Sequence, residues 1–158
     1  MGNSVIRIIP YREELAVYFK DFNITWLQKY FVVEPIDTLM LNDPKSYFLD
    51  KGGFIYFATL NNEITGTFAL LKNDDKVYEL SKMAVNDKYL GLKIGNKMME
   101  FCVQKAIELK VEKLVLYSNT ILKPAIHLYK KYGFKEVMIS KSDYKRANIK
   151  MELIIELN

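Results

Sequence analysis

The chain has 158 residues, a length typical of one domain with a hydrophobic core, and half of its residues are hydrophobic. With 27% charged residues the composition excludes a disordered chain, and we find no apolar run long enough to span a membrane and no secretory leader. The net charge of +4 comes without a basic run, so no nucleic-acid partner is expected. One cysteine and one histidine argue against disulfides and a metal site, and the cytoplasm is the expected location.

The first half of the chain is predicted to contain one long helix and four strands. Weak alternation predicts a short strand over residues 5–9, and large apolar residues at near-helical spacing predict a helix over residues 11–31. Prolines and glycines then indicate a loop with short helical turns over residues 31–50. A meander follows, with predicted strands over residues 54–60, 64–71 and 76–85, separated by turns rich in Asn and Asp.

The second half is predicted to alternate helices and strands. A helix is expected over residues 94–110, a strand over 113–117, a helix over 122–132 that ends at Gly133, and strands over 134–139 and 150–157. The strand, helix, strand order at its start favours a crossover between parallel strands. The whole order predicts an α/β (α+β) fold, a single domain over residues 1–158 with a mixed, mostly antiparallel sheet of six to seven strands and helices on both faces.

A glycine-punctuated turn joins the strand at 76–85 to the helix at 94–110. The first turn of a helix has unpaired N–H groups and the positive end of the dipole, so a loop with little side-chain bulk at this place suits a phosphate or pyrophosphate. The alternative is an ordinary strand-to-helix turn. The residues expected to hold the phosphates are Leu90, Gly91, Leu92, Lys93, Ile94, Gly95 and Asn96.

Two motifs frame the second half of the chain. The strand ELSKMAV, residues 79–85, leads into this turn, and the segment AIHLYKKYGF, residues 125–134, fits the pattern A-x-x-L-Y-x-x-x-G-F. Together, and at this separation, they resemble the GNAT (Gcn5-related N-acetyltransferase) superfamily over nearly the whole chain. The resemblance implies the GNAT acyltransferase fold and direct transfer of the acetyl group of acetyl-CoA to a primary amine in a ternary complex.

The turn departs from the family's pattern Gln/Arg-x-x-Gly-x-Gly/Ala. Leu90 stands in place of the polar residue and Lys93 in place of the first glycine, while Gly95 matches. A glycine lets the backbone approach the pyrophosphate closely, whereas a lysine brings a positive charge. The departures put the affinity for the cofactor and the conformation of the loop in question, and they are the one feature that favours a non-catalytic acyl-CoA-binding sensor or scaffold module.

The resemblance also assigns roles to residues on the strands. It implies that the backbones of Met83, Ala84 and Val85 pair with the pantetheine arm where this strand splays from the next one. Asn119, at the end of the following strand, is a weaker candidate for a bond to the pantetheine or the acceptor. Glu79 is the candidate general base, acting through water on the attacking ammonium. The alternative is a strand-edge carboxylate paired with a lysine such as Lys76 or Lys82.

Tyr129 is the candidate general acid in this resemblance. A phenol with a pKa near ~10 is close enough to a thiol at ~8.5 to protonate the leaving thiolate. On the predicted helix it lies at the edge of an expected core stripe made of Ile121, Ala125, Leu128 and Tyr132. The alternative is a tyrosine that only packs. Thr120 is a candidate cap of this helix, and His127 is expected on the surface.

The acceptor site is expected in the N-terminal helical region. Its aromatic residues and carboxylates suit a cationic amine through cation–π contacts and charge pairing, and the alternative is core aromatics with solvated acids. The candidates are Trp26, Tyr30, Phe31, Glu34 and Asp37. Cys102 lies on a core stripe, so no acyl-cysteine intermediate is expected. The many aromatic residues permit a homodimer.

Overall fold

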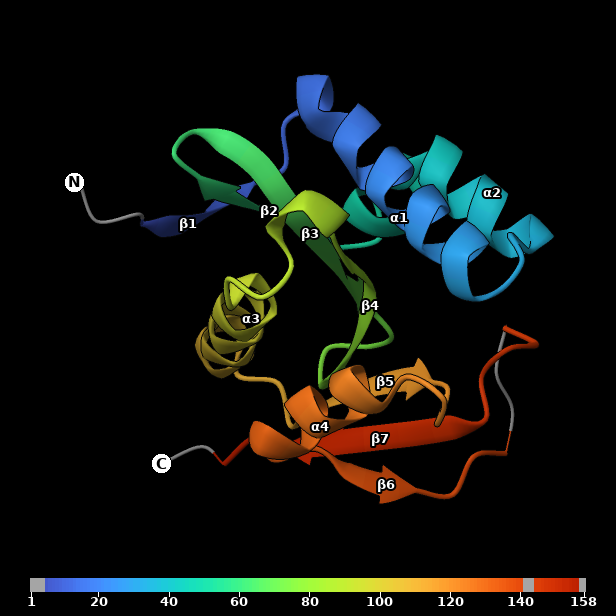
Figure 1. Cartoon of the computed structure of the whole chain (residues 1–158). Coiled ribbons are helices and arrows are strands. Elements are labelled where there is room, and N and C mark those ends of the chain that lie inside the picture. The colour runs from blue at the N-terminus through green and yellow to red at the C-terminus, as the bar shows by residue number, and fades with distance from the viewer. Residues whose placement is uncertain (1–4, 141–143, 157–158) are drawn as a thin grey trace.

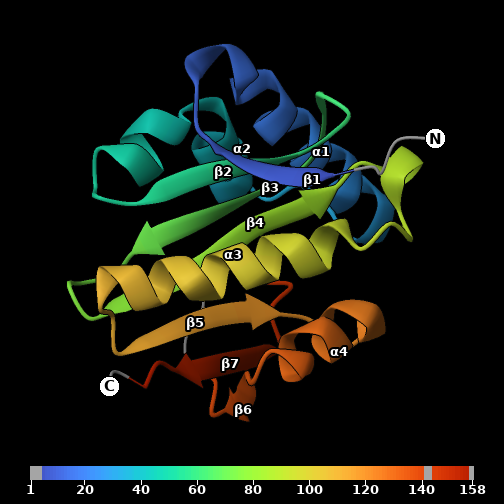
Figure 2. The same ribbon diagram turned by 90° about the vertical axis from the view of Figure 1, so that its left-hand side faces the viewer.

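A computed structural model describes residues 5–140 and 144–156. In these ranges seven strands form one mixed sheet in the order β1-β2-β3-β4-β5-β7-β6, with helices on both faces (Figures 1 and 2). The strands are β1 (Ile6–Pro10), β2 (Phe54–Leu60), β3 (Glu63–Lys72), β4 (Val77–Val85), β5 (Lys113–Ser118), β6 (Lys135–Val137) and β7 (Ile149–Ile154). The helices are α1 (Ala16–Tyr30), α2 (Pro35–Asn42), α3 (Ile94–Leu109) and α4 (Lys123–Lys131), with single turns at Glu13–Leu15, Lys45–Leu49 and Asp87–Tyr89. The predicted fold class is confirmed.

The predicted meander is present as β2, β3 and β4, which pair antiparallel. Asn61 and Asn62 join β2 to β3, and both have positive φ values, 52° and 67°. A two-residue hairpin turn of the I′ type needs left-handed backbone at both central positions, which Asn tolerates better than most residues. The Asn-Asn pair therefore fixes the register of the hairpin.

The sheet splits between β4 and β5. These strands are parallel and paired only from Val77–Glu79 to Lys113–Val115, whereas β5 pairs with β7 along its other edge as far as Ser118. Figure 1 shows β5, β6 and β7 turned away from the first four strands. The C-terminal half of β4 therefore has one edge without a strand partner in the described chain. This is the splay that the family resemblance implied.

Two hydrophobic cores cover the two faces of the sheet. On one face α3 packs through Ile94, Met98, Met99, Cys102 and Ala106, all buried, against β1, β2, β3 and β4 (Figure 2). On the other face α1 and α2 pack with buried residues of β2 and β3. These stripes recur every three and four residues, as the burial of one helix face requires. The predicted core position of Cys102 is confirmed.

The helices and strands differ from prediction in a few places. The expected loop over 31–50 contains the regular helix α2, which begins at Pro35 and has reciprocal capping bonds between Glu34 and Asp37. The predicted strand 134–139 is shorter, as β6, and the predicted strand 150–157 is present as β7, which ends at Ile154; the following two residues are described and are not strand, and Leu157 lies outside the described residues. Gly133 follows α4 with φ 98°, as predicted for a glycine that ends a helix.

The face that α4 presents to the core also differs from prediction. Ile121 precedes the helix and is 64% exposed, and the residues packed on the core are Ile126, Tyr129 and Tyr132. Thr120 does not cap α4, because the N-cap position is Leu122 and no side chain caps the helix; the Thr120 hydroxyl accepts a hydrogen bond from the Asn148 amide. Helix α4 begins at Lys123, with Pro124 in its first turn, so Ile121 lies outside the helix and cannot belong to a helical stripe. In residues 5–140 and 144–156, no helix is both long and apolar enough to cross a membrane.

Candidate active site

A large cavity lies at the N-terminus of α3, against β4 and α4. It has a volume of about 520 Å³, and its wall includes the C-terminal half of β4, the turn into α3 and one face of α4. The backbone N–H groups of residues 91–96 have no hydrogen-bond partner in the part of the chain that the structure describes. Unpaired N–H groups at the positive end of a helix form an anion site. All the expected cofactor residues except Asn119 and Leu92 line this cavity: Met83, Ala84, Val85, Leu90, Gly91, Lys93, Ile94, Gly95 and Asn96.

The turn into α3 is built on a left-handed lysine. Lys93, the residue before α3, has φ 64° and ψ 27°, and Gly91 has φ 80°. A residue with a Cβ pays roughly 1–2 kcal/mol for this conformation, which is why the family's glycine suits the position. Lys93 is exposed and is one of the residues that line the cavity, so it brings a positive charge to the cavity wall. Leu90 is 55% exposed and brings no polar group.

A smaller cavity of about 90 Å³ lies in the split between β4 and β5. Its polar lining residues include Glu79, Ser81, Tyr117, Asn119, Tyr144 and Arg146, and Trp26 of α1 and Phe31, directly after α1, also line it. Four residues line both cavities, namely Trp26, Met83, Leu122 and Tyr129. The two cavities therefore meet at these side chains.

Tyr129 lies on α4 where the two cavities meet. Its ring packs near Phe134, with 6.1 Å between centroids, and its hydroxyl has no hydrogen-bond partner among residues 5–140 and 144–156. Burial raises the pKa of Tyr129 to about 12, so the phenol stays protonated across the physiological range. The structure thus presents a proton donor at the junction of the two cavities.

Glu79 lies on β4, three residues before Lys82. It is 9% exposed, pairs with Val115 in the short parallel ladder and lines the smaller cavity. The two lysines considered as its partners are bound elsewhere, because Lys76 pairs with Glu112 and Lys82 with Asp37. Glu79 and Tyr129 therefore line one cavity from opposite sides of the split sheet.

A β-bulge at Lys82 separates the acid from the cofactor residues on β4. Thr67 pairs with Ala84 but Ala69 pairs with Ser81, so Lys82 and Met83 together lie opposite Phe68. Lys82 is left-handed, with φ 53°. Regular alternation along a strand would place Met83 on the face of Glu79, but the bulge breaks the alternation, and Met83 packs with the α3 core. One strand thus carries groups to both cavities.

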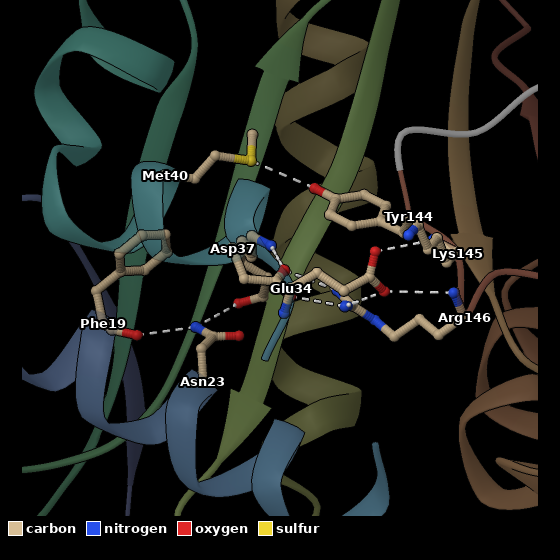
Figure 3. Close-up of polar contacts among 9 residues, drawn as sticks. Phe19, Asn23, Glu34, Asp37, Met40, Tyr144, Lys145 and Arg146 are labelled. Atoms are coloured by element: carbon tan, nitrogen blue, oxygen red, sulfur yellow. Dashed lines mark hydrogen bonds and ion pairs between the residues drawn. The ribbon is translucent and has the colours of Figure 1, made fainter. Parts of the chain in front are cut away.

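A buried ion network braces the bulge and one wall of the smaller cavity (Figure 3). Lys82 Nζ lies 2.6 Å from Asp37 Oδ1, and Arg146 binds both oxygens of Asp37 at 2.7 and 2.9 Å. Asn23 donates to the carbonyl of Lys82 at 3.2 Å. Burial alone would raise the pKa of Asp37, but the bonds from Arg146 and Lys82 lower it to about 2. Helices α1 and α2 therefore hold the bulge through both its backbone and its side chain.

Some expected site residues lie elsewhere. Glu34 lines neither cavity, because its carboxylate accepts hydrogen bonds from the backbone N–H groups of Lys145 and Arg146 and from the Arg146 guanidinium. Asp37 is fully buried in the ion network. Asn119 lines the smaller cavity, and its amide is used within the chain, donating to the Arg146 carbonyl at 2.7 Å and accepting from the Ile121 N–H at 3.0 Å.

The remaining expectations on the acceptor site fit the cavities. Trp26 lines both cavities, Tyr30 the larger one and Phe31 the smaller one. His127 is exposed, as expected. Among residues 5–140 and 144–156, no group of three or more acidic, histidine or cysteine side chains is placed to hold a metal ion.

Tyr144 and Arg146 are among the residues of the smaller cavity that the sequence did not indicate. Tyr144 and Arg146 precede β7, and Lys82 Nζ and the Arg146 guanidinium carbon each lie 4.6 Å from the Tyr144 ring centroid. Their only signal in the sequence is an aromatic and an arginine two positions apart in a polar segment between two strands. Their partners on α2 are more than a hundred positions away, which no local pattern reports.

Comparison with known proteins points to one family. The Acetyltransferase (GNAT) family model matches residues 16–134. The chain is 26% identical over 105 residues to the uncharacterized N-acetyltransferase YvbK of Bacillus subtilis, covering 65% of this chain and 68% of that protein. It is 26% identical over 99 residues to the probable N-acetyltransferase camello of Xenopus tropicalis, covering 61% of this chain and 45% of that protein, so the match spans less than half of the longer relative.

Solved structures agree with this assignment at the level of the fold. A GNAT-family acetyltransferase from Staphylococcus aureus Mu50 superposes with a TM-score of 0.86 at 22% identity, covering 96% of this chain and all of the other. A GNAT-family acetyltransferase from Elizabethkingia anophelis, solved with acetyl-CoA bound, gives a TM-score of 0.67 at 24% identity, covering 94% and 97% of the two chains. The chain belongs to the GNAT family of acetyltransferases.

Proposed function

We propose that this protein moves the acetyl group of acetyl-CoA directly to a primary amine while both substrates are bound. One observation carries the proposal. Tyr129, whose hydroxyl has no hydrogen-bond partner among the described residues, lines two cavities at once, one beside the N–H groups of residues 91–96 and one that contains Glu79. Two adjoining sites with a proton donor between them suit a reaction of two substrates side by side, where proximity supplies much of the rate.

The residues of the larger cavity fit acetyl-CoA. Six consecutive N–H groups at a helix N-terminus suit a pyrophosphate, and Lys93 adds a positive charge beside them. The unpaired edge of β4 beyond Glu79 offers backbone groups to an extended arm with amides, as an added peptide strand would use them. Acetyl-CoA would supply the activated thioester, and Met83, Ala84 and Val85 would hold its arm.

Tyr129 would give a proton to the departing thiolate. A phenol with a pKa of about 12 is a weaker acid than a thiol with a pKa near ~8.5 in water, so proton transfer from Tyr129 to a thiolate in water would be unfavourable. Burial acts on a thiol in the same direction, as in this chain it raises the pKa of Cys102 to about 12. A thiolate that forms beside Tyr129, out of water, would therefore accept its proton without a large mismatch.

Glu79 would take a proton from the attacking amine. An ammonium cannot attack a carbonyl, so the acceptor must lose a proton first, and a carboxylate in the same cavity can remove it through water. A covalent acyl-cysteine route has no support, because Cys102 is fully buried in the α3 core. Direct attack by the amine on the thioester is the route that these residues favour.

The test combines binding and turnover. We expect acetyl-CoA and CoA to bind the purified protein with micromolar affinity by calorimetry, and a panel of primary amines to release CoA thiol from acetyl-CoA. Binding without release by any amine would instead favour the acyl-CoA-binding sensor or scaffold function, which the departures at Leu90 and Lys93 support. No binding of either nucleotide would overturn both functions.

A further inference from the structure

Arg146 is a cation in the wall of the smaller cavity. A guanidinium beside a substrate site is the usual partner for a carboxylate, which it binds with two parallel hydrogen bonds. If Arg146 were available, amino acids and other acceptors with a carboxylate next to the amine would be favoured. The structure shows why it is not available.

The guanidinium of Arg146 is occupied by two acids of the chain itself. Its two terminal nitrogens bind Asp37 at 2.7 and 2.9 Å, and Nη1 also binds Glu34 at 3.1 Å (Figure 3). Glu34 accepts in addition from the backbone N–H groups of Lys145 and Arg146, at 2.9 and 3.3 Å. Bidentate binding of the kind that a substrate carboxylate would need is therefore already made inside the protein.

The second cation near this cavity is neutralised in the same way. Lys82 has a side chain that is 4% exposed, and its ammonium lies 2.6 Å from Asp37. The network thus contains two cations, Lys82 and Arg146, and two anions, Asp37 and Glu34. It leaves no uncompensated positive charge for a substrate carboxylate among the residues that the structure describes around this cavity.

The rest of the wall suits a cation. The rings of Trp26, Phe31 and Tyr117 line the cavity, and aromatic faces attract ammonium groups. Its volume of about 90 Å³ is several times the roughly 10–15 Å³ that one water needs, so it has room for the end of a narrow aminoalkyl chain.

We infer that the acceptor is a primary amine on a narrow chain with no carboxylate beside the amine, and that Glu34 contributes to this preference by occupying Arg146 together with Asp37. Amines of this class include aminoalkyl side chains of peptides, diamines and decarboxylated amino acids. The inference rests on the proposed function, since it takes the smaller cavity as the acceptor site.

The first test uses matched acceptors with and without the carboxylate, namely tyramine against tyrosine and 1,5-diaminopentane against lysine. We expect kcat/KM to be at least tenfold higher for the amine that lacks the carboxylate. Affinity for the CoA-saturated protein, measured by calorimetry, is expected to follow the same order. Equal values, a preference for the amino acids, or no binding of either amine would overturn the inference. If the amines without a carboxylate bind more tightly but no acceptor is acetylated, the inference on the acceptor is supported and only the proposed catalytic activity is contradicted.

The second test is Glu34→Gln, with Glu136→Gln as the matched control. The amide oxygen of the new side chain can still accept the backbone bonds, but the lost charge leaves Arg146 with Asp37 alone, so the discrimination against tyrosine and lysine should fall about three- to tenfold. Glu136 is exposed on β6 and lines neither cavity, so its variant should keep the wild-type ratio. If the folded Glu34→Gln protein discriminates against tyrosine and lysine as strongly as the wild type does, Glu34 does not contribute to the acceptor preference.

Discussion

Lys82 of β4 and Asp37 of α2 form an ion pair with 2.6 Å between Nζ and Oδ1, and both side chains are almost fully buried. The lysine is left-handed at a bulge, a conformation that costs of order 1–3 kcal/mol and persists only where its surroundings hold it. The pair ties α2 to the strand that separates the two cavities. Stability and the geometry of the site are therefore linked at this contact.

Removal of the carboxylate should cost more than removal of the ammonium. Asp37→Asn leaves Lys82 and Arg146 as facing cations, and the loss of one partner of a buried pair costs about 3–5 kcal/mol. Lys82→Met leaves Asp37 bound to both terminal nitrogens of Arg146. We expect a smaller fall in the free energy of unfolding for Lys82→Met, measured in urea. An equal or smaller loss for Asp37→Asn would show that the network is not organised around Asp37.

Acid should weaken the protein through the same carboxylate. The pKa of Asp37 is about 2 in the folded state against 3.8 in the unfolded chain, so ionised Asp37 stabilises the fold above pH 4, and this contribution is lost as the pH falls from 3.8 toward 2. The difference corresponds to about 2 kcal/mol. The stability gap between wild type and Asp37→Asn should narrow by this amount between pH 5 and pH 2. The exposed Asp21→Asn is the control, and a gap that stays constant would contradict the assignment.

The parts of the fold that were predictable have local signals. The β2–β3 hairpin follows from Asn61 and Asn62, and α3 follows from apolar residues at intervals of three and four. Helix α2 was predicted only as a short helical turn within a loop, because its eight residues carry too few turns for a periodic pattern, although Glu34, Pro35 and Asp37 in sequence are a capping signal. Local sequence patterns therefore predict the long helices and the strands, and they predict short helices less well.

The parts of the site that were predictable lie on single elements. The turn into α3 and Tyr129 on α4 are read from contiguous residues, and the structure brings them to the same cavity. The bulge at Lys82 has no glycine to mark it, and the role of Glu34 depends on Arg146, which is 112 positions away. Pairing between residues far apart in the sequence decides which acidic side chains face a substrate and which hold the protein together. Glu34 was therefore predicted in the acceptor site, whereas in the structure it binds Arg146.

Lys93→Gly should make the protein more stable and weaken its binding of CoA. Glycine removes the strain of a left-handed lysine, and a gain of up to ~1 kcal/mol would raise Tm by about 2–4 °C in a domain of this size. The same change removes a positive charge from the wall of the larger cavity, so we expect affinity to fall about fivefold in calorimetry at low salt.

Lys93→Asn separates the two effects, because Asn tolerates left-handed backbone but carries no charge. Its affinity for CoA should match that of Lys93→Gly, while Lys93→Arg should keep the wild-type affinity. Tighter binding by the glycine variant would mean that strain at Lys93, and not its charge, dominates its effect on the cofactor.

Tyr129→Phe should lower kcat by about 10²-fold or more and leave the affinity for acetyl-CoA nearly unchanged. The hydroxyl of Tyr129 has no partner in the described chain, so the variant loses no internal hydrogen bond and keeps its ring against Phe134. Tyr132→Phe is the matched control, since that hydroxyl donates to the carbonyl of Asn96 and its loss should reduce stability without a comparable fall in kcat.

The pH dependence gives a second readout on Tyr129. With a pKa of about 12 its phenol stays protonated through pH 10, so the wild-type rate should show no basic limb from this group below that pH. A wild-type kcat retained by Tyr129→Phe would remove the residue from the mechanism, and it would remain a packing tyrosine at the junction of the cavities.

Glu79→Gln should move the pH–rate profile to higher pH. Without a carboxylate in the smaller cavity, the enzyme depends on amine that has already lost its proton in bulk water, and that fraction grows as the pH approaches the pKa of the amine. We expect a lower kcat/KM at pH 7 that recovers toward the wild-type value at alkaline pH, with the exposed Glu136→Gln as a control that follows the wild-type curve. If the profile of Glu79→Gln superimposes on that of the wild type, Glu79 is not the base, and its buried carboxylate serves the structure of the split sheet.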